Sequence, residues 1–200
     1  MFCGIPAMQR LKGVGMEILT DFPKIQCPFI RQTYPVNKDH FKQSSWLAGG
    51  VPHFFSYYSA MRLHGMTSHQ LIDVYVTCVA RKTGRTISGI SYHFIYCRKK
   101  HFWGNAQQWV TKQDSVNVSD LERTVLDGLD RPDLCGGLTE VARGMWNKQK
   151  EIDPQKLVSY AKMFRTRAAV KRLGYVLEAL ELFPDIIPPL GQSIAAAKVF

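Results

Sequence analysis

Clusters of lysine and arginine are the side chains of this sequence best suited to chemistry, because they can hold the phosphates of a polyanion. Six of them flank two neighbouring β-rich stretches: Arg81, Lys82, Arg85, Arg98, Lys99 and Lys100. If the two stretches pair as a hairpin, we expect Arg81 and Lys82 to leave the sheet at the end where Arg98–Lys100 arrive. His101, Phe102 and Trp103 follow directly, and cations beside aromatic rings are typical of nucleic-acid binding. The alternative is a solvated turn beside a tryptophan that belongs to the core.

A second basic cluster lies further along the sequence and comprises Lys162, Arg165, Arg167, Lys171 and Arg172. On a helix, Arg167 and Lys171 lie away from the face that carries apolar residues such as Val170 and Leu173. We predict that Arg167 and Lys171 also belong to a nucleic-acid-binding surface. A protein contact surface, or simply a polar helix face, is the alternative interpretation.

The overall charge favours the same class of partner. The 200 residues include 26 Lys and Arg against 16 Asp and Glu, a formal net charge of +10 at pH 7. An excess of this size suggests a polyanion, most simply nucleic acid, although it also favours solubility. No run of apolar residues approaches the roughly 18 that a membrane span needs. The N-terminus also lacks the basic residues followed by an apolar stretch that are typical of a secretion signal. We therefore expect a cytoplasmic protein with no membrane partner.

Patterns for catalysis or metal binding are weak. The six histidines form no His-Glu-x-x-His motif, and no glycine-rich phosphate loop is present. The five cysteines lack zinc-site spacing, and Cys78 and Cys97 lie in apolar runs, which favours reduced cysteines that act as small hydrophobic residues. Asp120 and Glu122 are interpreted as first-turn helix residues that favour the helix dipole. We predict a protein that is not an enzyme and has no catalytic residues, metal or cofactor.

The spacing of apolar residues predicts the elements that must position the cations. Pro52–Gly65 is predicted helical, because apolar residues recur at helical intervals between a proline suited to a first turn and a glycine suited to a C-cap. Ile72–Val79 and Thr86–Cys97 are predicted strands, the second because apolar and polar residues alternate. Ser115–Val118 is predicted to be a shorter strand.

The rest of the chain is predicted to be helical. Ser119 and Glu122 have the spacing of a capping box for a first helix, and a pair of glycines precedes a second. Asp153, with a proline after it, is typical of the start of a third helix. A fourth ends before Pro184. Beyond it we expect an irregular tail, because two further prolines and a glycine follow.

These elements predict an α+β fold, with a small, mostly antiparallel sheet preceded by one helix and followed by a cluster of four helices. Residues 1–43 are broken by prolines and glycines and are predicted to be an irregular N-terminal arm. Residues 44–183 are predicted to be the main domain, and residues 184–200 the C-terminal tail.

Four segments carry a resemblance to a known family, in the same order along the chain. They are Tyr57–Met66 (YYSAMRLHGM), Val118–Asp127 (VSDLERTVLD), Arg131–Gly137 (RPDLCGG) and Val170–Glu178 (VKRLGYVLE). Together they resemble the AbiEi family, the antitoxins of type IV toxin–antitoxin systems, also described as predicted transcriptional regulators of a viral defence system. The resemblance covers residues 44–183 and corresponds to the C-terminal antitoxin domain of that family.

The resemblance implies a role in abortive infection against phage. The implied functional partner is an AbiEii-like nucleotidyltransferase toxin, whose effect such antitoxins oppose without a stable complex being required. Family members also carry an N-terminal winged helix-turn-helix that binds inverted repeats at their own promoter. Residues 1–43 are too few for a complete winged helix, so we interpret them as a possible remnant of one.

Two other functions stay open. One is a DNA-binding transcriptional repressor of its own operon, which would use the basic clusters and show sequence preference. The other is a nuclease-like enzyme with Asp73 on a central strand, which would show metal-dependent cleavage. Growth rescue would indicate the antitoxin. We also expect a buried ion pair between Arg172 and an acid such as Asp127, with a role in the fold.

Overall fold

The computed structural model describes residues 44–69, 73–109, 115–164 and 166–196, so the predicted arm of residues 1–43 lies outside the described residues. The fold is α+β, which confirms the predicted class. Six strands form one sheet: β1 (His53–Phe55), β2 (Val74–Cys78), β3 (Arg85–Ile87), β4 (Ile90–Tyr96), β5 (Asn105–Trp109) and β6 (Ser115–Ser119). Residues 44–48 form a short helix before β1.

One α-helix lies among the strands and five follow them. They are α2 (Tyr57–Leu63), α3 (Leu121–Asp130), α4 (Leu138–Lys148), α5 (Pro154–Met163), α6 (Arg167–Ala179) and α7 (Ile187–Ala196), with 3-10 turns η1 (Lys99–His101), η2 (Pro132–Leu134) and η3 (Pro184–Ile186). The predicted helix Pro52–Gly65 is therefore partly wrong. Its first residues form β1 instead, because pairing with β2 and β6 on both sides overrides a local helical preference.

The sheet is mixed, which corrects the prediction of a mostly antiparallel sheet. Its order is β3-β4-β2-β1-β6-β5. The pairs β1–β2, β3–β4 and β5–β6 are antiparallel, whereas β2–β4 and β1–β6 are parallel. The predicted strand Thr86–Cys97 is in fact a hairpin of β3 and β4, because Ser88 and Gly89 both have positive φ and reverse the chain.

The predicted hairpin between the two β-rich stretches is wrong, and the consequence is important for the cations. The strands β2 and β4 run parallel, with Val74 opposite Tyr92 and Cys78 opposite Tyr96. A hairpin would have placed the end of β4 at the opposite edge from the end of β2. Parallel pairing instead places both carboxyl ends at one edge, so the basic residues that follow each strand do meet.

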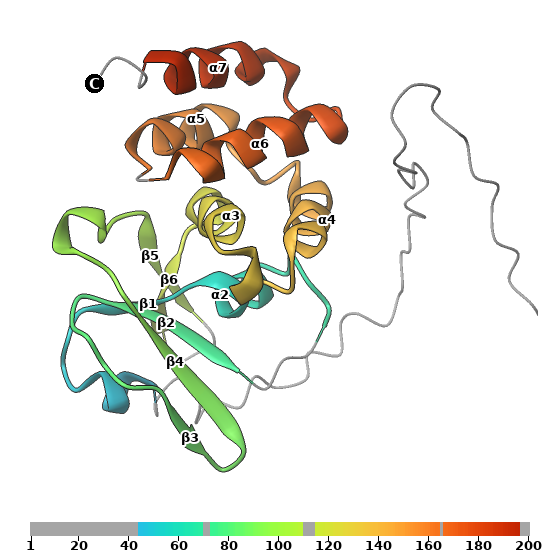
Figure 1. Cartoon of the computed structure of the whole chain (residues 1–200). Coiled ribbons are helices and arrows are strands. Elements are labelled where there is room, and N and C mark those ends of the chain that lie inside the picture. Colours follow the sequence, from blue (N-terminus) through green and yellow to red (C-terminus); the bar gives the residue numbers. More distant parts are fainter. Residues whose placement is uncertain (1–43, 70–72, 110–114, 165, 197–200) are drawn as a thin grey trace, which may run out of the picture. The chain divides into compact units, whose positions relative to one another are not determined.

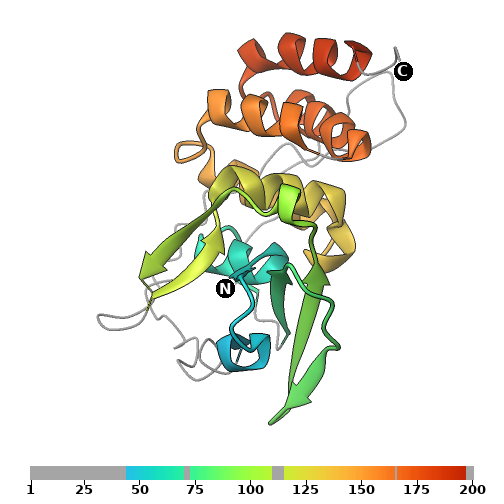
Figure 2. The same cartoon turned by 90° about the vertical axis from the view of Figure 1, so that its left-hand side faces the viewer.

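The helices pack in layers over the sheet. Figure 1 shows α3 and α4 between the sheet and the α5–α6 layer, with α7 outermost. Figure 2 shows α2 between the β5–β6 and β2–β4 parts of the sheet. The main core comprises buried residues from β2 and the helices α2–α6, and continues through η3 into α7. A smaller cluster of Phe55, Ala60, Val76 and Val118 lies where α2 packs on the sheet.

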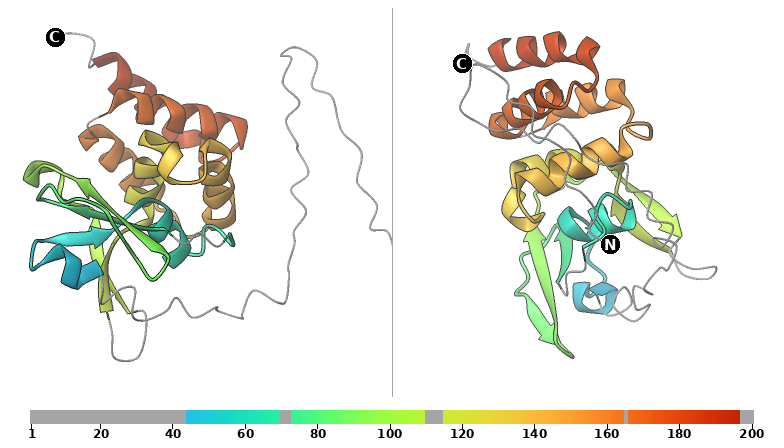
Figure 3. Two further views of the ribbon diagram at one scale, coloured as in Figure 1. Left: turned by 60° about the horizontal axis from the view of Figure 1, so that its bottom comes forward. Right: turned by 90° about the vertical axis from the view of Figure 1, so that its right-hand side faces the viewer.

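The segment after Pro184 is not an irregular tail. Residues 184–186 form η3 and residues 187–196 form α7, and Ile186 and Leu190 are buried in the main core. Figure 3 shows α7 beside α6 in two views. The two prolines after Ile187 are compatible with this helix, because they occupy its first turn, where no backbone N–H is needed.

Two predicted helix starts had different outcomes. Asp153 caps α5 as predicted, because its side chain accepts hydrogen bonds from the backbone N–H groups of Gln155 and Lys156. The predicted capping box of Ser119 and Glu122 is wrong. Asp120 is the N-cap of α3 and accepts from the N–H of Arg123, while Ser119 is the last residue of β6.

The described cysteines Cys78, Cys97 and Cys135 are buried thiols, which confirms the interpretation of Cys78 and Cys97 as small hydrophobic residues. Burial raises the pKa of the Cys78 and Cys135 thiols. No helix among the described residues is long and apolar enough to span a membrane.

Candidate nucleic-acid interface

The site is built at the edge where β2 and β4 both end. A hydrogen bond of 2.8 Å from the N–H of Cys97 to the carbonyl of Cys78 extends the pairing by one residue past β4. Arg81 lies three residues beyond β2, and Arg98 lies two residues beyond β4. The cations predicted at this part of the chain are named here the basic surface: Arg81, Lys82, Arg85, Arg98, Lys99 and Lys100.

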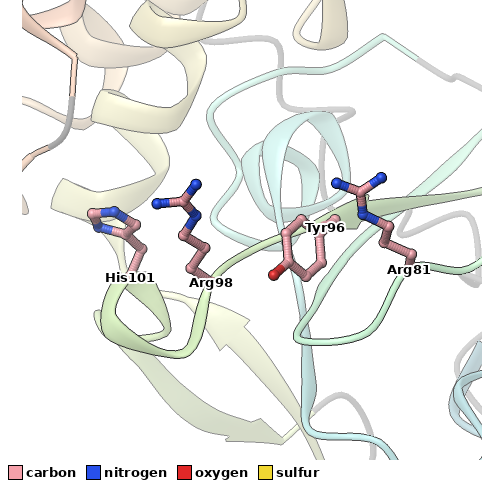
Figure 4. Close-up of a pocket in the computed structure, with 4 residues that line it drawn as sticks. All are labelled: Arg81, Tyr96, Arg98 and His101. Atoms are coloured by element: carbon pink, nitrogen blue, oxygen red, sulfur yellow. The ribbon is translucent and has the colours of Figure 1, made fainter.

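A hollow of about 380 Å³ lies at this edge and is lined by Arg81, Tyr96, Arg98 and His101. The Arg81 guanidinium carbon lies 5.3 Å from the centre of the Tyr96 ring, a cation–π contact. Figure 4 shows Arg98 and His101 beside each other, with Arg81 and Tyr96 next to them along the same edge. Tyr96 is 43% exposed. The hollow therefore presents two guanidinium groups and an accessible aromatic ring together.

A second hollow, of about 260 Å³, is lined by residues from three parts of the chain: Trp46, Leu47, Lys82, Thr83, Arg85 and Phe94. The Nζ of Lys82 donates a 3.1 Å hydrogen bond to the carbonyl of Leu47, which holds the loop after β2 against the helix of residues 44–48. An ammonium group has three donors, so two remain for a ligand. Trp46 is 75% exposed.

The cations of the basic surface have no acidic partner within the described part of the chain. None of the ion pairs between described residues includes one of them. Among the described residues that line the two hollows, none is an aspartate or glutamate. Unneutralised arginines around a concave surface create a positive potential that attracts anions.

The remaining cations that the sequence analysis selected lie outside the two hollows. Lys99 and Lys100 are exposed on η1, directly after Arg98, but do not line the hollows. Arg167 and Lys171 are exposed in α6 and do not line them either. The structure therefore brings together the cations that follow β2 and β4 in one site, and it does not add the α6 pair to that site.

The aromatic residues Phe102 and Trp103 face the interior. The ring of Phe102 lies 5.1 Å from that of Phe54, and the ring of Trp103 lies 4.8 Å from that of Tyr160. Trp103 is half-buried and packs against Tyr160 and Arg123, so its ring is engaged within the fold rather than presented at the basic surface. The accessible rings at the site are Tyr96 and Trp46, which the sequence analysis did not select. Tyr96 could have been found from its place at the end of an alternating strand, just before a basic run.

A buried arginine positions the backbone of the site. Arg123, 6% exposed, donates from Nε to Asp127 at 2.9 Å, and from one terminal nitrogen to the carbonyls of His101 and Trp103 at 3.3 and 3.4 Å. Its guanidinium carbon also lies 4.3 Å from the centre of the Trp103 ring. Asp127 is therefore the partner of Arg123, and the expected pair with Arg172 is wrong.

Lys156, whose side chain is 37% exposed, completes a polar network around the buried residues Glu122, Arg123 and Asp127. This set is named here the buried polar network: Asp120, Glu122, Arg123, Asp127, Lys156 and Tyr160. The Nζ of Lys156 lies 2.7 Å from Glu122 and 3.2 Å from Asp120, which also accepts a 2.8 Å hydrogen bond from the Tyr160 hydroxyl. Burial alone would lower the pKa of Lys156, but hydrogen bonds to the two carboxylates raise it above its usual range. Burial, with the hydrogen bond to Asp120, raises the pKa of Tyr160. Asp120 and Glu122 are thus both paired with the Lys156 ammonium group, and their role is in the fold.

Arg172 and Asp73 have structural partners too. Arg172 donates to the carbonyls of Leu129 and Asp130 at 2.7 and 3.3 Å, at the C-terminal end of α3, where a cation favours the helix dipole. Asp73 lies 3.7 Å from the His93 ring, just before β2 and at the strand end opposite the basic surface. No group of three or more His, Cys, Asp or Glu side chains suited to a metal ion occurs among the described residues.

Comparison with known proteins finds a similar fold among solved structures. No protein-family model matches the sequence, and no curated protein does. Among solved structures, the RV2827C protein from Mycobacterium tuberculosis is similar over 80% of this chain, with a TM-score of 0.55 and 15% sequence identity. The aligned part spans 58% of the mycobacterial chain, less than two thirds of its length. This similarity concerns the fold.

Proposed function

We propose that the protein is a non-enzymatic antitoxin of the AbiEi type that contacts nucleic acid through the basic surface. The observation that supports this best is the parallel pairing of β2 and β4, which brings unpaired cations from two loops together around an exposed tyrosine. The antitoxin part of the proposal rests on the resemblance of the four sequence segments, and the nucleic-acid part rests on the chemistry of this edge.

Phosphate binding is the chemistry that such an edge favours. An arginine presents a planar fork of donors that can hold two phosphate oxygens at once. Arg81 and Arg98 line one hollow and form no ion pair with another described residue, so a phosphate would displace none of the described acids on binding. Each phosphate neutralised in this way also releases condensed counterions, which makes binding depend on salt.

The buried polar network supports this role by fixing the loop after β4. Arg123 holds the carbonyls of His101 and Trp103, so η1 is held against the N-terminal part of α3. A loop that is already ordered loses less conformational entropy when it binds a ligand.

Growth rescue tests the proposal directly. The chain is co-expressed with an AbiEii-like nucleotidyltransferase toxin, and we expect the wild type to restore growth. A variant with Arg81, Arg85 and Arg98 changed to serine should fail to do so. Its control carries Arg131→Ser, Lys150→Ser and Lys162→Ser, which removes the same charge from exposed sites outside the two hollows. We expect this control to rescue.

Other results would point to different functions. Equal rescue by both variants would separate antitoxicity from the basic surface. If a folded wild type fails to rescue but binds the DNA upstream of its own operon with sequence preference, the protein is a repressor. Metal-dependent cleavage of nucleic acid that is lost in an Asp73→Asn variant would identify a nuclease.

A further inference from the structure

The two hollows have three kinds of lining residue in common. In each, a cation from the loop after β2 is accompanied by an arginine and an exposed aromatic ring. The members are Arg81, Arg98 and Tyr96 in the larger hollow, and Lys82, Arg85 and Trp46 in the smaller. A single anion site would not require this repetition.

The two hollows are also neighbours. Arg81 and Lys82 are consecutive residues, yet each lines a different hollow. Phe94 and Tyr96, one in each lining, lie on the same face of β4, and two residues of a strand span about 7 Å. The hollows therefore follow each other along β4 as two similar compartments.

We infer that these hollows are adjacent subsites for successive nucleotides of an unpaired nucleic-acid strand. Phosphates bind the cations, and bases stack on the aromatic rings. This inference rests on the proposed function and names its ligand more closely, as single-stranded RNA or DNA rather than a duplex.

Exposure of the rings favours an unpaired strand. In a duplex the bases stack on one another, so Trp46 and Tyr96 would remain exposed to water and contribute little. In an unpaired strand each base has a free face, and stacking on an aromatic side chain is a main source of affinity. Trp46 is 75% exposed and Tyr96 is 43% exposed, so both are accessible.

The Arg81–Tyr96 contact prepares one stacking surface in advance. The guanidinium lies over the ring, and a guanidinium plane can itself carry a stacked base. Lys82 is held by the carbonyl of Leu47, which places the loop after β2 beside Trp46. The rings and the cations thus reach the ligand from elements already fixed in place.

Binding to short labelled oligonucleotides, followed by fluorescence anisotropy at one fixed ionic strength, tests this inference. The probes are an unpaired RNA, an unpaired DNA of the same sequence, the corresponding DNA duplex and an abasic DNA strand that keeps the phosphates. The full chain is used as wild type and as Trp46→Ala, Tyr96→Ala and Trp109→Ala. Trp109 is the matched control, because it is 68% exposed in β5 and lines neither hollow.

We expect at least one unpaired probe to bind more tightly than both the duplex and the abasic strand. Trp46→Ala and Tyr96→Ala should each weaken binding of that probe about tenfold, within the range of base–aromatic stacking. Trp109→Ala should leave it unchanged. The comparison of RNA with DNA identifies which strand is the ligand.

Two results would overturn the inference, and they are distinguishable. If the duplex binds as tightly as the unpaired strands and the ring variants bind normally, the subsites are wrong while the proposed nucleic-acid surface stands. If the folded wild type binds no probe, the proposed nucleic-acid contact fails as well. Melting temperatures equal to that of the wild type confirm that the ring variants are folded.

Discussion

The basic surface and the buried polar network use the same kinds of charged group in opposite ways. In the network, Arg123 and Lys156 each lie within 3 Å of a carboxylate, and they connect α3 with α5 and the loop after β4. At the basic surface, Arg81 and Arg98 lie at an exposed edge without an acidic partner among the described residues. The comparison shows that the role of a lysine or arginine depends more on whether it has a carboxylate partner than on where it lies in the sequence.

The two regions are also connected. Arg123 holds the backbone of His101, whose ring lines the larger hollow. The network therefore contributes stability and positions the loop, while the basic surface contributes binding. If this division is correct, variants of the network should alter the free energy of unfolding, and variants of the basic surface should not.

The largest effect on stability is expected for Arg123→Met. Removing this guanidinium breaks its ion pair with the buried Asp127 carboxylate and its hydrogen bonds to two carbonyls, at a cost of about 3–5 kcal/mol. Urea unfolding followed by circular dichroism measures the change. The control is Arg131→Met, whose ion pair with Asp133 is about half exposed and should contribute less than about 1 kcal/mol. Equal losses in the two variants would contradict the comparison.

A smaller loss is expected for Arg172→Met. Its guanidinium donates to the last carbonyls of α3 and forms no ion pair with a buried acid among the described residues, so we expect a cost of about 1–2 kcal/mol. The same unfolding measurement applies. A loss as large as that of Arg123→Met would mean that Arg172 takes part in a buried ion pair after all.

A smaller loss of stability is expected at alkaline pH, because the network contains groups that lose a proton there. The pKa of Lys156 is higher in the folded protein than the ordinary value of 10.5, and that of Tyr160 is higher than 10.0. The folded state therefore keeps protons that the unfolded state releases, and stability must fall as pH rises above about 10. Melting temperatures from pH 8 to 11 measure this decline. It should be shallower in Lys156→Met, and an unchanged slope in that variant would show that Lys156 does not contribute to it.

The smallest effect on stability is expected at the basic surface. The triple variant of Arg81, Arg85 and Arg98 to serine loses no ion pair among the described residues and relieves repulsion between like charges. Its free energy of unfolding should stay within about 0.5 kcal/mol of the wild type. Destabilisation by several kcal/mol would show that these arginines have a role in the fold.

Much of the fold could be predicted where the signals are local. The helix start at Asp153 and the apolar stripe of α6 each depend on a few neighbouring residues, and both are present. The pairing of β2 with β4 could not be predicted in this way. It joins strands across an intervening β3, and the direction of a strand is not encoded in its alternation.

The candidate site shows the same division. The basic runs are visible in the sequence, but their partners are not, and only the structure separates the unpaired Arg81 from the buried Arg123. The spacing of Arg123 and Asp127 on one helix face could have indicated their pair, since residues four apart are neighbours on a helix. Trp46 could not have been found, because it reaches the site from a short helix far away in the sequence.

The most direct test of the account is the salt dependence of nucleic-acid binding by three proteins: the wild type, the triple variant of Arg81, Arg85 and Arg98, and the charge-matched control of Arg131, Lys150 and Lys162. The slope of log affinity against log salt counts the phosphates that a protein neutralises. We predict that the slope falls by about 2–3 in the triple variant and stays unchanged in the control. Equal slopes in the two variants would show that overall charge, and not the edge of β2 and β4, binds the nucleic acid.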